Sequence, residues 1–218
     1  MPHAALIFAN GDINDGAMVQ QALAHAHQPQ VIAADGGARA ALYFGYLPDL
    51  VIGDLDSLSA VEVSSLAAQG VTIQRHPAEK DETDLELALK VAVQQGATWL
   101  RIIGAVGDRA DQTLANFYLL ALPELAGRDV AFVAGKQAIR LLRAGEHQLS
   151  GAIGDTLSLL PLGGAVHGVR TDGLRYPLHD ETLAFGPARG VSNVMQRDQV
   201  TVQLREGVLL VVHTVGRA

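Results

Sequence analysis

The amino-acid sequence predicts an N-terminal parallel α/β sheet domain with helices on both faces, followed by a C-terminal antiparallel β-sandwich domain. Two observations indicate this fold class. Up to about residue 134, short apolar runs alternate with longer stretches of helical periodicity, as in parallel sheets. Beyond that point the apolar runs are short and separated by turn residues, with no long helix between them. We therefore expect an α/β domain over residues 1–136 and a β-sandwich over residues 137–218.

The first domain is expected to alternate strands and helices along the chain. Its strands are near-continuous apolar runs, which indicates that both faces of the sheet are buried. The predicted strands are 4–10, 31–37, 49–54, 71–76, 99–105 and 129–134. The predicted helices are 18–27, 38–45, 61–70, 83–96 and 113–123. Gly70 and Gly96 close two of these helices, in the position that most often takes glycine.

The second domain is expected to consist of short antiparallel strands. Its main apolar runs are AIRLLRAGEHQLSG, DTLSLLPLG, VTVQLREG and VLLVVHTVG, at 138–151, 155–163, 200–207 and 208–216. Each run ends in glycine, which is typical of strands joined by turns. The pattern fits a sandwich or a barrel, and we predict the sandwich.

Composition narrows the possible functions. The net charge of −7 argues against a broad surface for nucleic acid or acidic membrane. The chain has no cysteine, which excludes disulfides and thiolate metal sites and fits a reducing compartment. The first residues lack the basic and apolar regions of a signal peptide, and no apolar stretch has the length of a membrane span. We expect a cytoplasmic protein that binds neither nucleic acid nor membrane.

Acidic residues and glycines follow five consecutive predicted strands. They lie in the segments 10–12, 35–37, 53–56, 80–84 and 104–111. The carboxyl ends of parallel strands meet at one edge of the sheet, where ligands bind. Each acid alone could cap a helix or close a turn. Capping needs one acid per helix, however, so the complete set favours a binding site.

The residue types at this edge indicate metal-assisted phosphate chemistry. Carboxylates without His or Cys select Mg²⁺ or Ca²⁺, and Asp54 and Asp56 could approach one ion. Glycines allow backbone N–H groups to approach phosphates, and Lys80 and Arg109 could neutralise phosphate charge. The motifs GxxxxGK[ST] and GxGxxG are absent, which argues against a P-loop enzyme and a classical dinucleotide site. The residues thus predict a Mg²⁺-dependent enzyme acting on a phosphorylated substrate, with a nucleotide favoured.

Seven motifs, in order along nearly the whole chain, resemble those of the thiamine pyrophosphokinase family. They are ADGGARAAL (34–42), GDLDSL (53–58), KDETDLELAL (80–89), GDRADQTLAN (107–116), GDTLSLLPL (154–162), GLRYPL (173–178) and GVSNV (190–194). The resemblance implies a homodimer that uses Mg²⁺ to transfer pyrophosphate from ATP to the hydroxyl group of thiamine, releasing AMP. It also implies an active site shared between the two subunits.

The resemblance assigns roles to individual residues. The implied metal ligands are Asp54, Asp56 and Asp84, and the implied catalytic residues are Arg109, Asp111 and Asp84. The residues implied to contact ATP or its phosphates are Asp35, Gly36, Gly37, Lys80, Asp81, Thr83 and Gln112. The residues implied to bind thiamine are Ser192, Asn193 and Tyr176. Gln112 stands where many bacterial members have histidine.

Three questions stay open at the level of sequence. The proton acceptor for the thiamine hydroxyl is either Asp84 or Asp111. The same acids would also serve transfer to another hydroxyl, such as that of a pterin, or hydrolysis of a nucleotide. A protein that only senses a nucleotide, with the β domain as an interaction module, is the non-enzymatic alternative. Clustered carboxylates argue against it, because they repel phosphate unless a metal is present.

Overall fold

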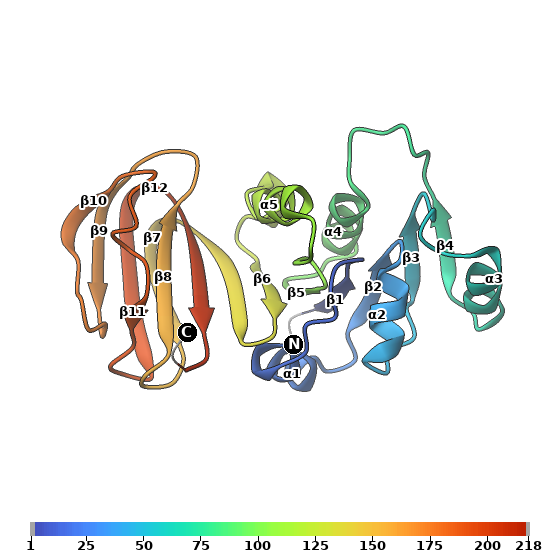
Figure 1. The fold of residues 1–218 in the computed structure, drawn as a ribbon, viewed down its shortest axis with the longest axis horizontal. Helices are drawn as coiled ribbons and strands as arrows, with labels where there is room; N and C mark the ends of the chain where they lie inside the picture. Colours follow the sequence, from blue (N-terminus) through green and yellow to red (C-terminus); the bar gives the residue numbers. More distant parts are fainter. Residues whose placement is uncertain (1–2, 217–218) are drawn as a thin grey trace. The chain divides into compact units, whose positions relative to one another are not determined.

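The structure is a computed structural model that describes residues 3–216, and it divides into two compact units between Gly135 and Lys136. The N-terminal unit is an α/β sheet and the C-terminal unit is built of antiparallel strands (Figure 1). This confirms the predicted fold class. Among the described residues, no helix combines the length and the apolar character needed to cross a membrane.

The first unit contains a parallel sheet in the order β4-β3-β2-β1-β5-β6. These strands are β1 (Ala4–Phe8), β2 (Gln30–Ala34), β3 (Leu50–Gly53), β4 (Thr72–Arg75), β5 (Trp99–Ile103) and β6 (Asp129–Ala134). The chain first moves outward from β1 to β4, and then returns to the other side of β1 with β5. This reversal creates a switch point between β1 and β5, the place where open α/β sheets bind ligands.

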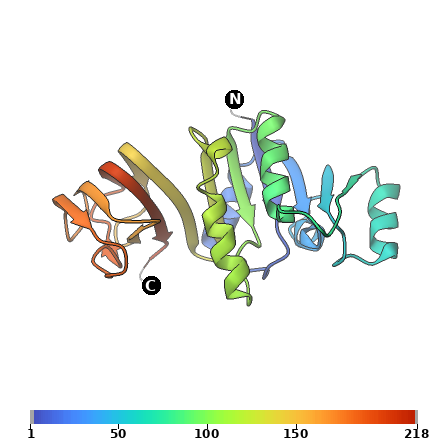
Figure 2. The same ribbon diagram turned by 90° about the horizontal axis from the view of Figure 1, so that it is seen from above.

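The helices of the first unit cover both faces of the sheet. They are α1 (Ala17–His25), α2 (Gly37–Tyr43), α3 (Ala60–Ala68), α4 (Asp84–Gln94), α5 (Ala110–Leu119) and the short 3₁₀ helix η1 (Pro123–Leu125). Helices α1 and α2 lie on one face of the sheet, and α4 and α5 lie on the other (Figure 2). The sheet is therefore covered on both sides, as its apolar strands predict.

Local sequence explains where α3 and α4 begin and end. Ser59 and Glu62 form a reciprocal capping box at the start of α3, and Thr83 caps α4 by accepting a hydrogen bond from the N–H of Glu86. Gly70 and Gly96 follow these helices with φ angles of 89° and 90°, which favour glycine. Helix α5 begins three residues before the predicted start, at Ala110.

The second unit is organised around two long strands, β7 (Gln137–Ser150) and β12 (Gln199–Thr214), which pair along nearly their whole length. The first half of β12 also pairs with β9 (Val166–Asp172), and its second half pairs with β8 (Thr156–Pro161). Strand β10 (His179–Leu183) extends the first of these layers, and β11 (Asn193–Val194) the second. An apolar core that includes Leu157, Val169, Val202 and Leu209 fills the unit.

The sequence pattern separates residues 200–207 from 208–216, but the structure joins them in one strand. Three residues of β12, from Arg205 to Gly207, stand opposite a single residue of β7, which makes a bulge. Gly207 has a φ of 96°, a conformation that favours glycine. The glycine that resembles a turn signal in the sequence therefore bends a continuous strand.

Candidate active site

A cavity of about 500 Å³ lies in the first unit, at the carboxyl ends of the strands beside the switch point. Its walls come from residues that follow β1, β2, β3 and β5 and from the starts of α4 and α5. They lie within the segments 9–12, 34–35, 80–85 and 104–116, together with Asp54. Polar and charged side chains from four strand ends thus meet in one space, although they are distant in the sequence.

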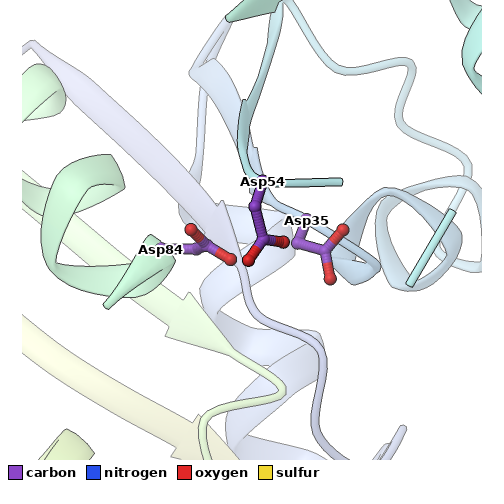
Figure 3. Close-up of side chains that lie close together, drawn as sticks. All are labelled: Asp35, Asp54 and Asp84. Carbon is purple, nitrogen blue, oxygen red and sulfur yellow. The ribbon is translucent and has the colours of Figure 1, made fainter. Parts of the chain in front are cut away.

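Three carboxylates converge in this cavity. Asp35, Asp54 and Asp84 each offer an oxygen atom, and these oxygens lie within 4.8 Å of one another. Figure 3 shows the three side chains close together, following β2 and β3 and at the start of α4. Asp35 is buried, and the other two are half-buried. Oxygens at this separation can bind one divalent cation.

The backbone around the three acids is shaped to bring them together. Gly53 directly precedes Asp54, and a Cβ atom at residue 53 would lie 2.7 Å from the carboxylate carbon of Asp84. Only glycine permits this approach. Asp35 and Leu55 have positive φ angles of 47° and 63°, unusual for residues with a side chain. Backbone strain of this kind tends to occur at functional sites.

The electrostatics of the cluster fit a bound cation. Burial raises the pKa of Asp84; Lys80 opposes this shift, and the charges of Asp54 and Asp35 add to it. The Lys80 ammonium nitrogen lies 3.0 Å from Asp84 Oδ1 and 4.0 Å from Asp54 Oδ2. Within the described chain, the buried Oδ1 of Asp35 has no hydrogen-bond donor. Lys80 thus neutralises only part of the cluster, and an anionic oxygen remains available.

Asp56, which the sequence predicts as a metal ligand, does not join this group. Its side chain is exposed, and its Oδ1 accepts a hydrogen bond from Ser57 Oγ at 3.1 Å. Its backbone N–H donates to Asp54 Oδ1, also at 3.1 Å. The structure brings Asp35 beside Asp54 and Asp84 instead, whereas the sequence assigned Asp35 to ATP. The metal role of Asp56 stays a prediction from the resemblance.

Arg109 and Asp111 form an ion pair at the start of α5. The Arg109 Nη2 atom lies 2.6 Å from Asp111 Oδ2, and Nε lies 3.3 Å from Oδ1. This pairing lowers the pKa of Asp111, and the Arg109 side chain remains 71% exposed. The Thr113 hydroxyl contacts both the N–H and the carbonyl oxygen of Gly107, which closes the loop between them. Arg109 is thus held at the wall of the cavity by a short, internally bonded loop.

Of the residues predicted to contact ATP, Asp35, Lys80, Thr83 and Gln112 line the cavity. Gly36, Gly37 and Asp81 lie outside its lining. The structure gives the two glycines a packing role. A Cβ atom at Gly37 would lie 2.0 Å from the carbonyl oxygen of Phe8, and one at Gly36 would lie 2.2 Å from Asn10 Oδ1. These glycines let α2 pack directly against the end of β1.

Five further polar residues line the cavity although sequence reasoning assigned none of them a role in the site: Asn10, Asp12, Asp108, Thr113 and Asn116. Asn116 is buried, and its Nδ2 donates to the carbonyl oxygen of Ala105 at 2.8 Å. Asn10, Asp12 and Asp108 follow β1 and β5, so their position after a strand was the signal that could have identified them. Asn116 lies almost two turns into α5 and gave no such signal.

In the second unit, the structure brings the three predicted thiamine-binding residues together. The Asn193 side chain accepts a hydrogen bond from the N–H of Tyr176 and donates one to its carbonyl oxygen, at 3.0 and 2.7 Å. Ser192 precedes Asn193 with a φ of 59°, and its N–H donates to Ser158 Oγ. Tyr176 is 57% exposed, and the Arg175 guanidinium lies 5.5 Å from its ring centre. Asn193 thus fixes the backbone from which an exposed aromatic ring projects.

Comparisons with known proteins agree with this arrangement. The model of the thiamin pyrophosphokinase catalytic domain matches residues 21–130, and that of the vitamin B1 binding domain of the same enzyme matches residues 146–209. The chain is 26% identical to thiamine pyrophosphokinase of Bacillus subtilis over 184 residues, which cover 84% of this chain and 86% of the relative.

Solved structures show the same fold. A crystal structure of the Bacillus subtilis enzyme matches with a TM-score of 0.85 and 24% identity, covering 97% of this chain and 99% of that one. The thiamin pyrophosphokinase from Geobacillus thermodenitrificans matches with a TM-score of 0.83 and 26% identity, covering 97% of both chains. Because the two family models together span most of the chain, this protein belongs to the thiamin pyrophosphokinase family.

Proposed function

We propose that this protein transfers the terminal pyrophosphoryl group of ATP to the hydroxyl group of thiamine, forming thiamine diphosphate and AMP. Membership of the thiamin pyrophosphokinase family supports this activity. The observation that carries the proposal is the meeting of Asp35, Asp54 and Asp84 in a cavity at the switch point of the sheet. Such a site suits a metal-bound polyphosphate.

In this proposal, Asp54 and Asp84 bind Mg²⁺ together with Asp35, and Asp56 completes the set of acids. The fit rests on three converging carboxylates and on the buried Asp35 oxygen that lacks a hydrogen-bond donor within the described chain. When bound, Mg²⁺ supplies positive charge that neutralises phosphate oxygens during transfer. Lys80 lies against the same carboxylates and is placed to meet a phosphate as well.

The remaining residues bind and orient the reactants. Arg109 faces the cavity and presents a guanidinium that can hold two phosphate oxygens. The thiamine hydroxyl oxygen forms a bond to the β-phosphorus, the bond between that phosphorus and the bridging oxygen to the α-phosphorus breaks, and AMP leaves with the electron pair. Asp84 is the better candidate to accept the hydroxyl proton. Asp111 is engaged with Arg109, which lowers its pKa and makes it a weaker base.

Thiamine is proposed to bind at Ser192, Asn193 and Tyr176, in the second unit. The exposed Tyr176 ring offers a surface for an aromatic ring system, and Ser192 offers hydrogen-bonding groups beside it. The reaction requires these residues to meet the ATP site of the first unit. We propose that they do so in a homodimer, with each active site formed by two subunits.

The metal site can be tested with matched variants. Asp35→Asn and Asp54→Asn keep the shape of the side chain but remove the charge that holds Mg²⁺, so each should abolish turnover and leave the fold intact. Asp180→Asn is the control, since Asp180 has a similar positive φ, 58° against 47° for Asp35, and lies in the second unit. Full activity of both Asp35→Asn and Asp54→Asn at ordinary Mg²⁺ would refute the metal assignment.

A further inference from the structure

Arg39 joins two segments that each contain one of the converging acids. It lies on α2, and its Nε and Nη2 atoms bind Glu62 Oε1 and Oε2 at 2.6 and 2.9 Å. The same Nη2 atom donates to the backbone carbonyl oxygen of Ser57 at 2.8 Å. One guanidinium thus holds a carboxylate by two bonds and a loop carbonyl by a third.

The positions of these partners in the chain show which two segments Arg39 connects. Helix α2, which bears Arg39, begins two residues after Asp35. Ser57 lies three residues after Asp54, in the loop that leads from β3 to α3. A displacement of either segment would stretch the bonds of Arg39. The Arg39 side chain therefore links the segment of Asp35 to that of Asp54, whose carboxylates must lie at a defined separation to share an ion.

Further hydrogen bonds run from this link to the carboxylate of Asp54. Ser57 Oγ donates to Asp56 Oδ1, and the N–H of Asp56 donates to Asp54 Oδ1, both at 3.1 Å. Asn10 Nδ2 donates to Ser57 Oγ from the end of β1. Between the two aspartates, Leu55 is buried in a conformation with a φ of 63°. The loop is thus held in a strained shape by contacts on several sides.

Glu62 is well suited to anchor Arg39. Its carboxylate also accepts hydrogen bonds from the N–H and the hydroxyl of Ser59, at 2.8 and 2.7 Å. The Arg39 guanidinium and these bonds to Ser59 lower the pKa of Glu62 to about 2. Glu62 consequently stays ionised at every pH at which the protein would work, and it is fixed to the start of α3 rather than free to follow Arg39.

We propose that Arg39 is a positioning residue that sets the separation of Asp35 and Asp54 and thereby the affinity of the metal site. This inference rests on the proposed metal site. The Arg39 and Glu62 side chains are 52% and 36% exposed, and exposed ion pairs contribute little to stability. The effect of Arg39 should therefore be seen in metal binding rather than in folding. Partners that contact metal ligands directly change metal affinity by about 10- to 100-fold, and Arg39 acts on the ligands indirectly, through the loop that contains Ser57.

The test is a titration of the purified protein with Mn²⁺ alone, followed by electron paramagnetic resonance, together with thermal unfolding of the metal-free protein. Arg39→Met keeps the apolar stem and should weaken Mn²⁺ binding about tenfold, the lower end of the range for such partners. The melting temperature should change little. Arg39→Lys should also bind Mn²⁺ less tightly, because an ammonium cannot hold Glu62 by two bonds and Ser57 by a third.

Arg205→Met is the matched control. Arg205 is an exposed arginine paired with Asp180 in the second unit, and its loss should leave Mn²⁺ affinity unchanged. Wild-type protein that binds no Mn²⁺ would overturn the metal site itself. Wild-type binding with equal affinity in Arg39→Met would overturn only the role of Arg39. If Arg39→Met does not fold, Arg39→Lys is compared with the wild-type protein instead. Wild-type affinity of Arg39→Lys for Mn²⁺ would then overturn the role of Arg39.

Discussion

The side-chain amide of Asn193 forms hydrogen bonds with both backbone polar groups of Tyr176, seventeen residues earlier in the chain. Asn193 is buried, and Tyr176 projects its ring to the surface. The two residues therefore have different roles in the proposed thiamine site. Asn193 orients the backbone, and Tyr176 presents the aromatic surface.

Asn193→Ala should raise the KM for thiamine strongly and leave the KM for ATP nearly unchanged, because only the proposed thiamine site loses its support. The partly buried backbone groups of Tyr176 would also lose their partners, which should lower the free energy of unfolding by at most about 1–3 kcal/mol. Steady-state kinetics and urea unfolding measure the two effects. An equal rise in both KM values would contradict the assignment.

Arg109→Lys should be far from conservative. The guanidinium can hold two phosphate oxygens at once and an ammonium cannot, and the charge that it meets is greatest in the transition state. We expect kcat to fall more than the affinity for ATP. Single-turnover kinetics at saturating ATP, combined with ATP binding by calorimetry, separates the two quantities. Lost ATP affinity with unchanged turnover would refute this role.

The buried pair of Asp155 and His213 predicts how the second unit responds to acid. Burial raises the pKa of Asp155, but hydrogen bonds from Ala152 N–H, Gly216 N–H and His213 outweigh it and lower the pKa below the ordinary value. A lowered folded pKa stabilises the protein above the unfolded pKa of about 3.9, and this contribution is lost as the pH falls through the folded value.

Asp155→Asn should therefore lower the melting temperature at pH 5. The difference from wild type should shrink as the pH falls below about 4. Thermal unfolding across this range, followed by circular dichroism, measures it. A difference that grows on acidification would show that the sign of the pKa shift is wrong.

The proposal that two subunits share each active site can be tested by mixing two inactive variants. Asp54→Asn removes a proposed metal ligand, and the double variant Ser192→Ala, Asn193→Ala removes the proposed thiamine contacts. After subunit exchange, half of the dimers are mixed, and one of their two sites has neither lesion if sites are shared. About a quarter of wild-type activity should then return. No recovery, with exchange confirmed by mass spectrometry, would place each site within one chain.

Much of the fold could be predicted, because the residues that mark helix ends agree with the pattern of apolar runs along the chain. Apolar runs of the first unit are strands, and Gly70 and Gly96 mark helix ends as expected. The second unit was harder to predict in detail. Gly207 lies in a bulge within β12, and only pairing with β7 reveals that the strand continues.

The sequence predicts at which edge of the sheet the candidate site lies, but it does not predict which side chains come together there. The sequence shows that acids follow the strands. It does not show that a positive φ at residue 35 and the missing side chain of Gly53 bring Asp35 and Asp84 beside Asp54. Spacing alone favoured Asp56 over Asp35, since Asp56 is close in sequence to Asp54. Tertiary geometry decided which acids converge.

The central claim is that the β- and γ-phosphates of ATP move together to thiamine. The most direct measurement is incubation of the protein with Mg²⁺, thiamine and ATP labelled with ³²P at the γ-phosphate, followed by separation of all products. We predict labelled thiamine diphosphate and an equal amount of unlabelled AMP. Labelled thiamine monophosphate with ADP, or labelled inorganic phosphate or pyrophosphate without any thiamine ester, would contradict the account.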